Sequence, residues 1–424
     1  MTEPRKTLLV DVEQGHWRLV EPGSVPEDAL DGSGAEFSTL CTLAHLEVPR
    51  MASGGVLESL REVGLQPESQ RIPWEWVCGE SWAAELARFA SKFFEDPRWN
   101  SEIAKITRTY LTVVEPKTNW YMSDNVMSPF RVNHESYRSV IEDKDEHAGV
   151  RSTVGSFNPI SKNNDCAEIL YSRNTVTGRL KVIEGPEILR VKREHRENIL
   201  TSSHEDGQLW YLDYSSLEPR TLLELPPKQD ILDFSPKTND IYTELRESLG
   251  LSEKDITRKA MKLCVVQQMY GMSHTKLAQQ LLEEGVRYPD DFMEMVSDVF
   301  KLNEMAKELN SVRDRFGGNY ILNGLDRPIA VTYETTWSTL LNYYTQSTAV
   351  DLALLGFGQI INKINSVDGA SKVFCPKAVL HDALILDVDS SVKHLVHKLA
   401  AVAEQVQLPN RDRVVRLPIS ADLL

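Results

Sequence analysis

The sequence predicts an α+β fold, because strand-like segments are mixed with long helical ones without strict alternation. Short apolar runs typical of strands occur at Leu209–Leu212, Ala378–Leu380 and Ile385–Val388. Apolar residues at helical spacing mark Asp255–Tyr270, Phe292–Leu309, Trp337–Leu354 and Ser391–Val406. This regular pattern begins after about residue 166, so we expect the α+β domain in the remainder of the chain.

The composition is that of an ordinary globular protein with an acidic balance. The 424 residues include 47 Lys and Arg against 62 Asp and Glu, for a formal net charge of −15, and 41% are hydrophobic. The length suggests roughly two or three domains, and the composition argues against intrinsic disorder. The acidic balance argues against non-specific coating of nucleic acid, although a nucleic-acid enzyme needs only a local basic surface.

Several sequence features point to the cytoplasm. No stretch approaches 18 uninterrupted apolar residues, and the amino-terminal apolar run is too short for a signal peptide. The five cysteines are an odd number and include no C-x-x-C pair. We therefore expect no membrane association, no structural zinc site and a reducing compartment.

Two aspartates each follow an apolar, strand-like run. Asp213 follows Leu209–Leu212, and Asp382 lies with His381 at the tip of a predicted hairpin, Ala378–Val388. Two aspartates from separate strands can share a pair of Mg²⁺ ions that stabilise the attacking and leaving oxygens of a phosphoryl transfer. Either motif alone would be read as a turn former or a solvated hairpin.

A basic segment lies between the two aspartates, at residues 256–280, and contains no Asp or Glu. Four of its residues are spaced by four and so share one helix face: Arg258, Lys262, Val266 and Tyr270. This face is about 18 Å long, which suits a nucleoside triphosphate with its phosphates on the cations. Without the flanking aspartates, a solvated basic face would be the preferred interpretation.

Five motifs, in this order, resemble those of family A DNA polymerases. The segment TGRL at Thr177–Leu180 resembles the primer-strand motif, and LDYSSLEPR at Leu212–Arg220 resembles motif A. Motif B is matched by Arg258–Ser273, the N-x-x-x-Q of the following helix by Asn342 and Gln346, and motif C by LHDA at Leu380–Ala383. The resemblance covers about residues 175–424.

The resemblance implies a right-hand polymerase fold with palm, fingers and thumb, preceded by a small N-terminal region of unknown fold. We expect residues 1–110 to form that region and 111–175 to form the thumb or a connecting region. Residues 176–424 would form the palm and fingers, with the fingers at about 230–335.

The resemblance also implies a nucleotide site with two Mg²⁺ ions. Asp213, Asp382 and the backbone carbonyl of Tyr214 would bind the metal. Arg258 and Lys262 would hold the incoming triphosphate and neutralise its charge. The remaining residues implied at the nucleotide are Val266, Tyr270 at the templating position, and Glu218, which would fill the space of a ribose 2′-OH.

At the primer–template, the resemblance implies four further residues. Arg179, Asn342 and Gln346 would read the minor groove at the primer terminus, where the acceptors are shared by all base pairs. His381 would support the primer end.

The sequence departs from the family pattern at four positions. Ala383 replaces the Glu of motif C, Val266 a Phe or Tyr, Gln267 a small residue and Ser338 a common arginine. These departures favour a divergent phage- or plasmid-type branch. Asp11 and Glu13 imitate the first exonuclease motif, but no partner motif follows, so we interpret them as structural and expect no complete exonuclease domain.

The predicted function is template-directed addition of dNTPs to a primer 3′ end in phage or plasmid DNA replication. The expected partners are primer–template DNA, dNTPs and a separate exonuclease, processivity or helicase protein; for a phage enzyme the location would be the cytoplasm of the infected bacterial host. One alternative is a single-subunit RNA polymerase-like enzyme, which would have a small residue in place of Glu218. The other is a non-catalytic DNA-binding replication factor.

Overall fold

The computed structural model describes residues 7–11, 16–20, 106–107, 109–122, 126–228, 231–232, 234–409 and 411–424. The chain divides into two compact units. The first comprises Met1–Pro116 with Phe316–Thr332, and the second comprises Lys117–Arg315 with Tyr333–Leu424. Much of the region expected at residues 1–110 lies outside the described residues, and so does Glu13; Asp11 ends a strand.

The described part of the first unit contains two antiparallel strand pairs. One pairs β1 (Thr7–Asp11) with β2 (His16–Val20), and the other pairs β8 (Tyr320–Leu322) with β9 (Pro328–Ala330). A π-helical turn, η2 (Tyr110–Val114), precedes the short helix α7 (Glu115–Thr118). All motifs singled out in the sequence, apart from Asp11 and Glu13, lie in the second unit.

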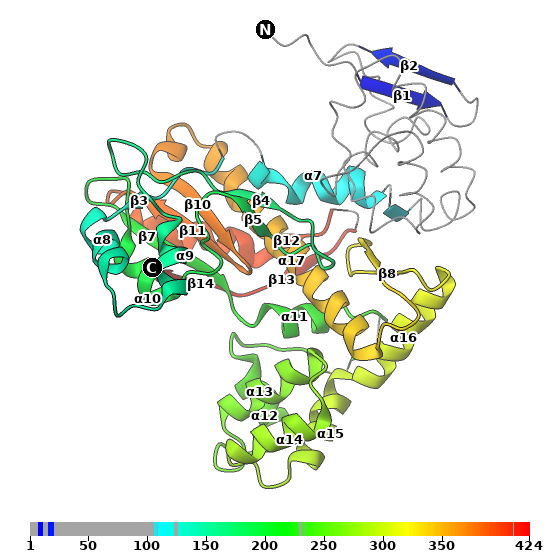
Figure 1. Cartoon of the computed structure of the whole chain (residues 1–424). Coiled ribbons are helices and arrows are strands. Elements are labelled where there is room, and N and C mark those ends of the chain that lie inside the picture. The colour runs from blue at the N-terminus through cyan, green and yellow to red at the C-terminus, as the bar shows by residue number, and fades with distance from the viewer. Residues whose placement is uncertain are drawn as a thin grey trace. The chain divides into compact units, whose positions relative to one another are not determined.

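In the described residues, four strands form an antiparallel sheet within the second unit (Figure 1). They are β10 (Phe374–Leu380), β11 (Ala383–Val388), β7 (Gln208–Tyr214) and β14 (Ile419–Leu423), in that spatial order. Each of the three strand-like segments recognised in the sequence lies in this sheet. The register places Ala383 opposite Asp213, so the tip of the β10–β11 hairpin meets the end of β7.

The helix α17 (Trp337–Asn365) has 29 residues and is the longest element described. Its middle is buried almost all round, as expected for a helix that is apolar on every face. It contacts α11 (Leu217–Glu224), α16 (Leu302–Arg315), the 3₁₀ turn η6 (Ala401–Glu404) and β12 (Gln405–Gln407). Because α11 directly follows β7, this packing links the end of the sheet to the helical part of the unit.

Four helices form a bundle next to α16 (Figure 1): α12 (Ile241–Ser248), α13 (Arg258–Met269), α14 (His274–Glu283) and α15 (Pro289–Phe300). Thr257 caps α13 by accepting a hydrogen bond from the Ala260 N–H at 3.1 Å. Gly271 ends this segment with a left-handed φ of +72°, and the Met272 N–H bonds back to the Gln267 carbonyl.

Two of the expected helices are wrong in extent. The predicted helix at residues 292–309 is divided into α15 and α16, because Lys301 adopts a left-handed φ of +50° that interrupts the helical backbone. The predicted helix at residues 391–406 consists instead of η5 (Lys393–Leu395), α18 (Val396–Ala400) and η6, and it ends in β12, which pairs with β13 (Val414–Arg416). The pairing of β12 with the nearby β13 decides that ending.

The remaining described elements of the second unit are short. They are η3 (Trp120–Met122), β3 (Arg131–Val132), α8 (His134–Glu142), α9 (Ala148–Gly155), β4 (Leu170–Ser172), β5 (Lys181–Glu184), α10 (Arg193–Ile199), β6 (Leu200–Thr201) and η4 (Ala370–Lys372). In the described part of the chain, no helix has both the length and the apolar character that a membrane crossing requires.

The contact between α17 and β7 predicts an unusual cost for a glycine substitution. A methyl group at Gly356 would overlap the hydroxyl of Tyr214, which is buried and donates a 2.8 Å hydrogen bond to the Ala403 carbonyl. Although Gly→Ala inside a helix normally stabilises it, we expect Gly356→Ala to lower the free energy of unfolding by about 1–3 kcal/mol. Urea unfolding measures this change.

The control variant lacks the Tyr214 hydroxyl oxygen that the added methyl group would overlap. In a Tyr214→Phe background, the added methyl group no longer meets a hydroxyl, so most of the cost of Gly356→Ala should disappear. An equal cost in both backgrounds would contradict the proposed overlap.

Candidate active site

The pairing of β7 with β11 brings the two predicted aspartates together. Asp213 is the penultimate residue of β7, and Asp382 lies in the two-residue turn between β10 and β11. The Tyr214 N–H donates a 3.1 Å hydrogen bond to the Asp382 carbonyl, which joins the two motifs through the backbone. His381 adopts a left-handed φ of +53°, so the turn is tight and presents both side chains at the strand ends.

The electrostatics of this pair favour a cation. Burial, together with the charges of Asp382 and Asp422, raises the pKa of Asp213 to about 7. Burial also raises the pKa of Asp382. Lys262 opposes both shifts but does not cancel them. The two carboxylates therefore lie where negative charge is poorly compensated by the protein itself.

The described residues contain no cluster of three or more His, Cys, Asp and Glu side chains suited to a metal. Mg²⁺, however, is typically bound by one or two carboxylates and completes its shell with water and substrate phosphates. Asp213 and Asp382 meet this requirement, because they are paired across adjacent strands and disfavour full ionisation without a counter-charge. The donor set therefore fits Mg²⁺ rather than a metal that needs an all-protein cage.

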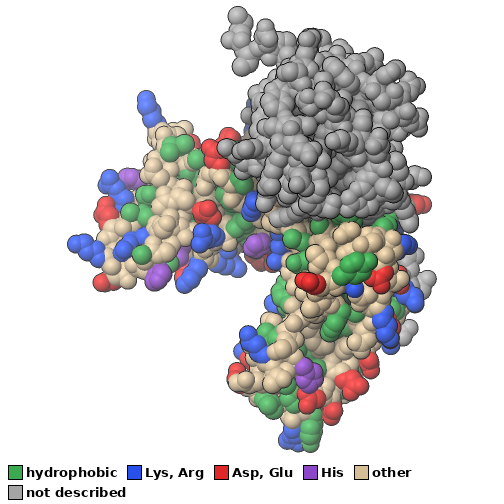
Figure 2. All heavy atoms as spheres, turned by 45° about the vertical axis from the view of Figure 1, so that its right-hand side comes forward, with side chains coloured by type: hydrophobic (Ala, Val, Ile, Leu, Met, Phe, Trp, Pro, Cys, Tyr) green, Lys and Arg blue, Asp and Glu red, His purple; other side chains and the backbone are tan. Residues whose placement is uncertain are grey.

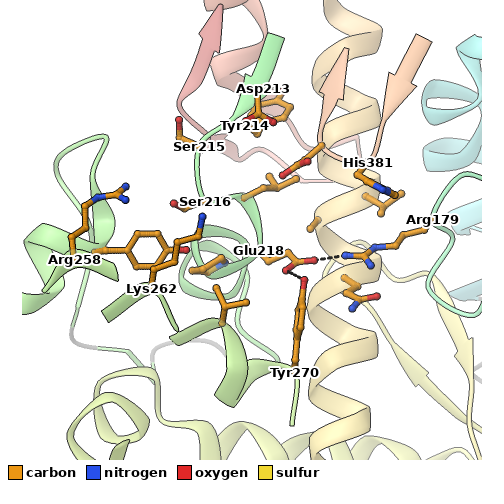
Figure 3. Close-up of a pocket in the computed structure, with 18 residues that line it drawn as sticks. Arg179, Asp213, Tyr214, Ser215, Ser216, Glu218, Arg258, Lys262, Tyr270 and His381 are labelled. Atoms are coloured by element: carbon orange, nitrogen blue, oxygen red, sulfur yellow. Dashed lines mark hydrogen bonds and ion pairs between the residues drawn. The ribbon is translucent and has the colours of Figure 1, made fainter. Parts of the chain in front are cut away.

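These aspartates border a cavity of about 470 Å³ that is drawn in Figure 3. Figure 2 shows the surface hollowed between the sheet-bearing part of the second unit and the helical bundle. The lining comes from the end of β7, the start of α11, one face of α13, the middle of α17 and the hairpin turn. The lining residues are Arg179, Asp213, Tyr214, Ser215, Ser216, Leu217, Glu218, Pro219, Tyr242, Arg258, Lys262, Val266, Tyr270, Gln346, Ala349, Val350, His381 and Asp382.

The face of α13 identified in the sequence does line this cavity. Arg258, Lys262, Val266 and Tyr270 all contribute to it. Lys262 is exposed, and no described residue forms a hydrogen bond or ion pair with it, although its charge acts on both aspartates. A cation is thus available beside two carboxylates, on a helix held by its Thr257 cap.

On the opposite side of the cavity, Glu218 connects two neighbours (Figure 3). Arg179 donates to one carboxylate oxygen at 2.6 Å, and the Tyr270 hydroxyl donates to the other. Burial and the nearby Glu218 raise the pKa of Tyr270 to about 12, so its hydroxyl stays protonated as a donor. The TGRL loop, α11 and the end of α13 therefore meet at a single carboxylate.

The predicted primer-side residues are only partly brought together. Gln346 on α17 and His381 line the cavity, and Arg179 reaches it from the TGRL loop. Asn342, one helical turn before Gln346, does not line it. Burial and the charges of Arg179 and Arg196 lower the pKa of His381, which favours a neutral imidazole near neutral pH.

The structure places other residues at the site that the sequence motifs did not indicate. Tyr242 on α12 lines the cavity, and Arg258 lies over its ring, with the guanidinium carbon 5.4 Å from the ring centroid. Asp240 pairs with Arg258, and Asp422 on β14 acts electrostatically on Asp213. No sequence periodicity could have indicated these residues, because each reaches the site from an element separate from the motifs.

The structure shows the surroundings of the four residues that depart from the family pattern. Ala383 is fully buried opposite Asp213, and Val266 is half-buried on the cavity wall. Gln267 is half-buried on the same helix. Ser338 lies directly against Gly271, where a β-carbon would come within 2.5 Å of the Ser338 β-carbon.

The raised pKa of Asp213 predicts that stability depends on pH when divalent metal is absent. The folded-state pKa of about 7 exceeds the unfolded value near 4, so the folded state binds more protons between these values. The free energy of unfolding should therefore fall as the pH rises from about 4 to 7. Asp213→Asn should remove on the order of 1 kcal/mol of this fall, a figure reduced for the partial exposure of the group.

Urea unfolding in EDTA at several pH values would measure this difference. Asp368→Asn, at an exposed residue after the end of α17, is the matched control and should keep the wild-type slope. The assignment would be contradicted by equal pH slopes for wild type and Asp213→Asn.

Comparison with known proteins agrees with the motifs. The family model for DNA polymerase family A matches residues 105–422. The POL domain of Pol1 from M. smegmatis, in complex with DNA primer-template and dNTP, has a similar fold, with a TM-score of 0.60 and 15% identity over 96% of this chain and 90% of that chain. No curated protein matches the sequence significantly. Because the family match covers well over half of the sequence, the chain belongs to DNA polymerase family A and is a DNA-directed DNA polymerase.

Proposed function

We propose that the cavity between β7, α11, α13 and α17 is the active site in which this polymerase adds dNTPs to a primer 3′ end on a DNA template. The observation that carries the proposal is the pairing of β7 with β11, which puts Asp213 and Asp382 side by side opposite the cationic face of α13. Two carboxylates and a free lysine around one cavity suit the transfer of a negatively charged phosphoryl group.

In this proposal Asp213, Asp382 and the backbone carbonyl of Tyr214 hold two Mg²⁺ ions. The bound ions would neutralise charge on the attacking and leaving oxygens. The protein itself contributes by holding the two carboxylates in fixed positions, because both aspartates lie at the ends of paired strands. Burial and the neighbouring carboxylates, which raise the pKa of Asp213, support this role.

The nucleotide would lie along α13. Lys262 and Arg258 would meet the phosphates, since both project from the face that lines the cavity. Val266 offers an aliphatic contact to the base or sugar, and Tyr270 closes the far end of the face beside Glu218. Two donors hold the carboxylate of Glu218, which supports a role in which it would fill the space of a ribose 2′-OH.

The primer terminus would lie beside the hairpin turn. Arg179 and Gln346 are the candidates for reading its minor groove, and His381 for supporting its end, since all three border the cavity. Asn342 is one turn closer to the N-terminus of α17 than Gln346 and lies outside the cavity lining, and it would contact the minor groove there. In this assignment residues 176–424 supply the palm and fingers, with the fingers at about 230–335, and residues 111–175 supply the thumb or a connection.

The wider context proposed for the enzyme is phage or plasmid DNA replication in the cytoplasm. The replacements at Ala383, Val266 and Ser338 support a divergent branch of the family. A separate exonuclease, processivity or helicase partner would complement a chain in which no complete set of exonuclease motifs was found.

The metal assignment predicts a large loss of activity. Asp213→Asn and Asp382→Asn should each lower primer extension with Mg²⁺ by about a thousandfold, because an amide does not supply the anionic ligand that the site needs. Extension of a labelled primer on a DNA template measures this loss, with Asp368→Asn as the matched control. Near-normal extension by either active-site variant would place the metal elsewhere.

The role of Glu218 predicts a change in sugar choice. Glu218→Ala should raise the efficiency of rNTP relative to dNTP incorporation by about 10- to 100-fold, because it opens space for the 2′-OH. The matched control is Glu224→Ala, on the same helix but outside the cavity. Comparable use of rNTPs and dNTPs by the wild type would favour the RNA polymerase-like alternative, and incorporation of neither would favour a DNA-binding factor.

A further inference from the structure

The guanidinium of Arg258 already has an ionic partner. Its Nε atom donates to both carboxylate oxygens of Asp240, at 3.0 and 2.8 Å. Its guanidinium carbon also lies 5.4 Å from the centroid of the Tyr242 ring, within cation–π range. Lys262, one turn along the same helix, has no such partner among the described residues. Of the two cations assigned to the triphosphate, Arg258 is therefore already paired with a carboxylate, whereas Lys262 has no such partner among the described residues.

The carboxylate of Asp240 is itself held in place. Asp240 is the N-cap of α12, and the Thr243 hydroxyl donates to it at 2.7 Å. Burial acts to raise the pKa of Asp240, but hydrogen bonds from Arg258 and Thr243 outweigh it and lower the pKa. Asp240 thus stays ionised and points at Arg258 from a helix terminus, although it does not line the cavity.

The pair is weak enough to be exchanged. The side chains of Arg258 and Asp240 are 51% and 40% exposed, so solvent and salt screen their attraction. A triphosphate carries more charge than one carboxylate and can accept more than one hydrogen bond from a guanidinium. Arg258 can therefore leave Asp240 for a phosphate, but only by giving up the contact that it already has.

We propose that Asp240 is a positioning residue that competes with the incoming nucleotide for Arg258, so that each dNTP binds by displacing this carboxylate. This proposal rests on the proposed function, in which Arg258 contacts the triphosphate. Asp240 then weakens nucleotide binding by the amount of the interaction that must be broken. It also keeps Arg258 at the edge of the cavity, beside Tyr242 and across from Arg179 (Figure 3), until a nucleotide arrives.

The test is the affinity for the next correct dNTP on a primer that ends in a dideoxynucleotide, measured with Mg²⁺. Asp240→Asn removes the charge while asparagine keeps the cap of α12. We expect the Kd to fall by about two- to fivefold, the range for an exposed ion pair, and the effect to shrink at high salt. Asp240→Ser, another uncharged capping residue, should give the same result and guards against a defect peculiar to asparagine.

A second ion pair on the same helix supplies the matched control. Lys259 pairs with Glu284 at 2.6 Å, and neither residue lines the cavity. Glu284→Gln should leave the Kd for dNTP unchanged. In steady-state extension, Asp240→Asn should lower the KM by a larger factor than it changes kcat, a split that a general loss of folding would not produce.

Variants of Arg258 separate this inference from the proposed function. Arg258→Ala should raise the Kd, and adding Asp240→Asn to it should change nothing further. If Arg258→Ala leaves the Kd unchanged, Arg258 does not hold the triphosphate and both proposals fail. If Arg258→Ala raises the Kd but Asp240→Asn raises it or leaves it unchanged, only the competition is overturned; a rise would mean that Asp240 instead orients Arg258 for the nucleotide.

Discussion

The antiparallel pairing of β7 with β11 is the constraint on which the rest of the site depends. It sets Ala383 opposite Asp213 and allows the Tyr214 N–H to bond to the Asp382 carbonyl. A slip of one residue would turn Asp213 to the other face of the sheet. All of β11 is buried, and β7 buries Leu209, Leu212 and Tyr214, so hydrophobic packing holds the register. In the proposed function, formation of the sheet would therefore also align the two aspartates for metal binding.

Helix α17 connects this sheet to the primer-side loop through a buried ion pair. Arg173 is bonded to Asp351 of α17, and it also donates to the Gly178 carbonyl and to the Thr118 hydroxyl. Both charged side chains are almost completely buried, so their desolvation offsets much of the attraction. We interpret the ion pair of Arg173 and Asp351 as a contact that positions the TGRL loop, and with it Arg179, relative to the cavity.

The cations around the cavity differ in whether they are already paired with a carboxylate. Arg179 is bonded to Glu218 and Arg258 to Asp240, whereas Lys262 forms no hydrogen bond or ion pair with a described residue. In the proposed function, the triphosphate would bind one lysine that has no ionic partner among the described residues and one arginine whose partner can be exchanged. In the proposed function, the two cations of α13 supply the local positive charge with which a chain of net charge −15 would bind a polyanionic substrate.

The sequence by itself determined the fold class, the family and nearly all of the cavity-lining motif residues, because these depend on local patterns. Spacing by four residues put Arg258, Lys262, Val266 and Tyr270 on one face, and the structure confirms that face. Only the tertiary structure decided that α15 and α16 are separate, that Asn342 lies beyond the cavity, and that Asp240 and Tyr242 meet Arg258. The break between α15 and α16 follows the left-handed backbone of Lys301, and the other features arise from packing between separate elements; helical periodicity records neither.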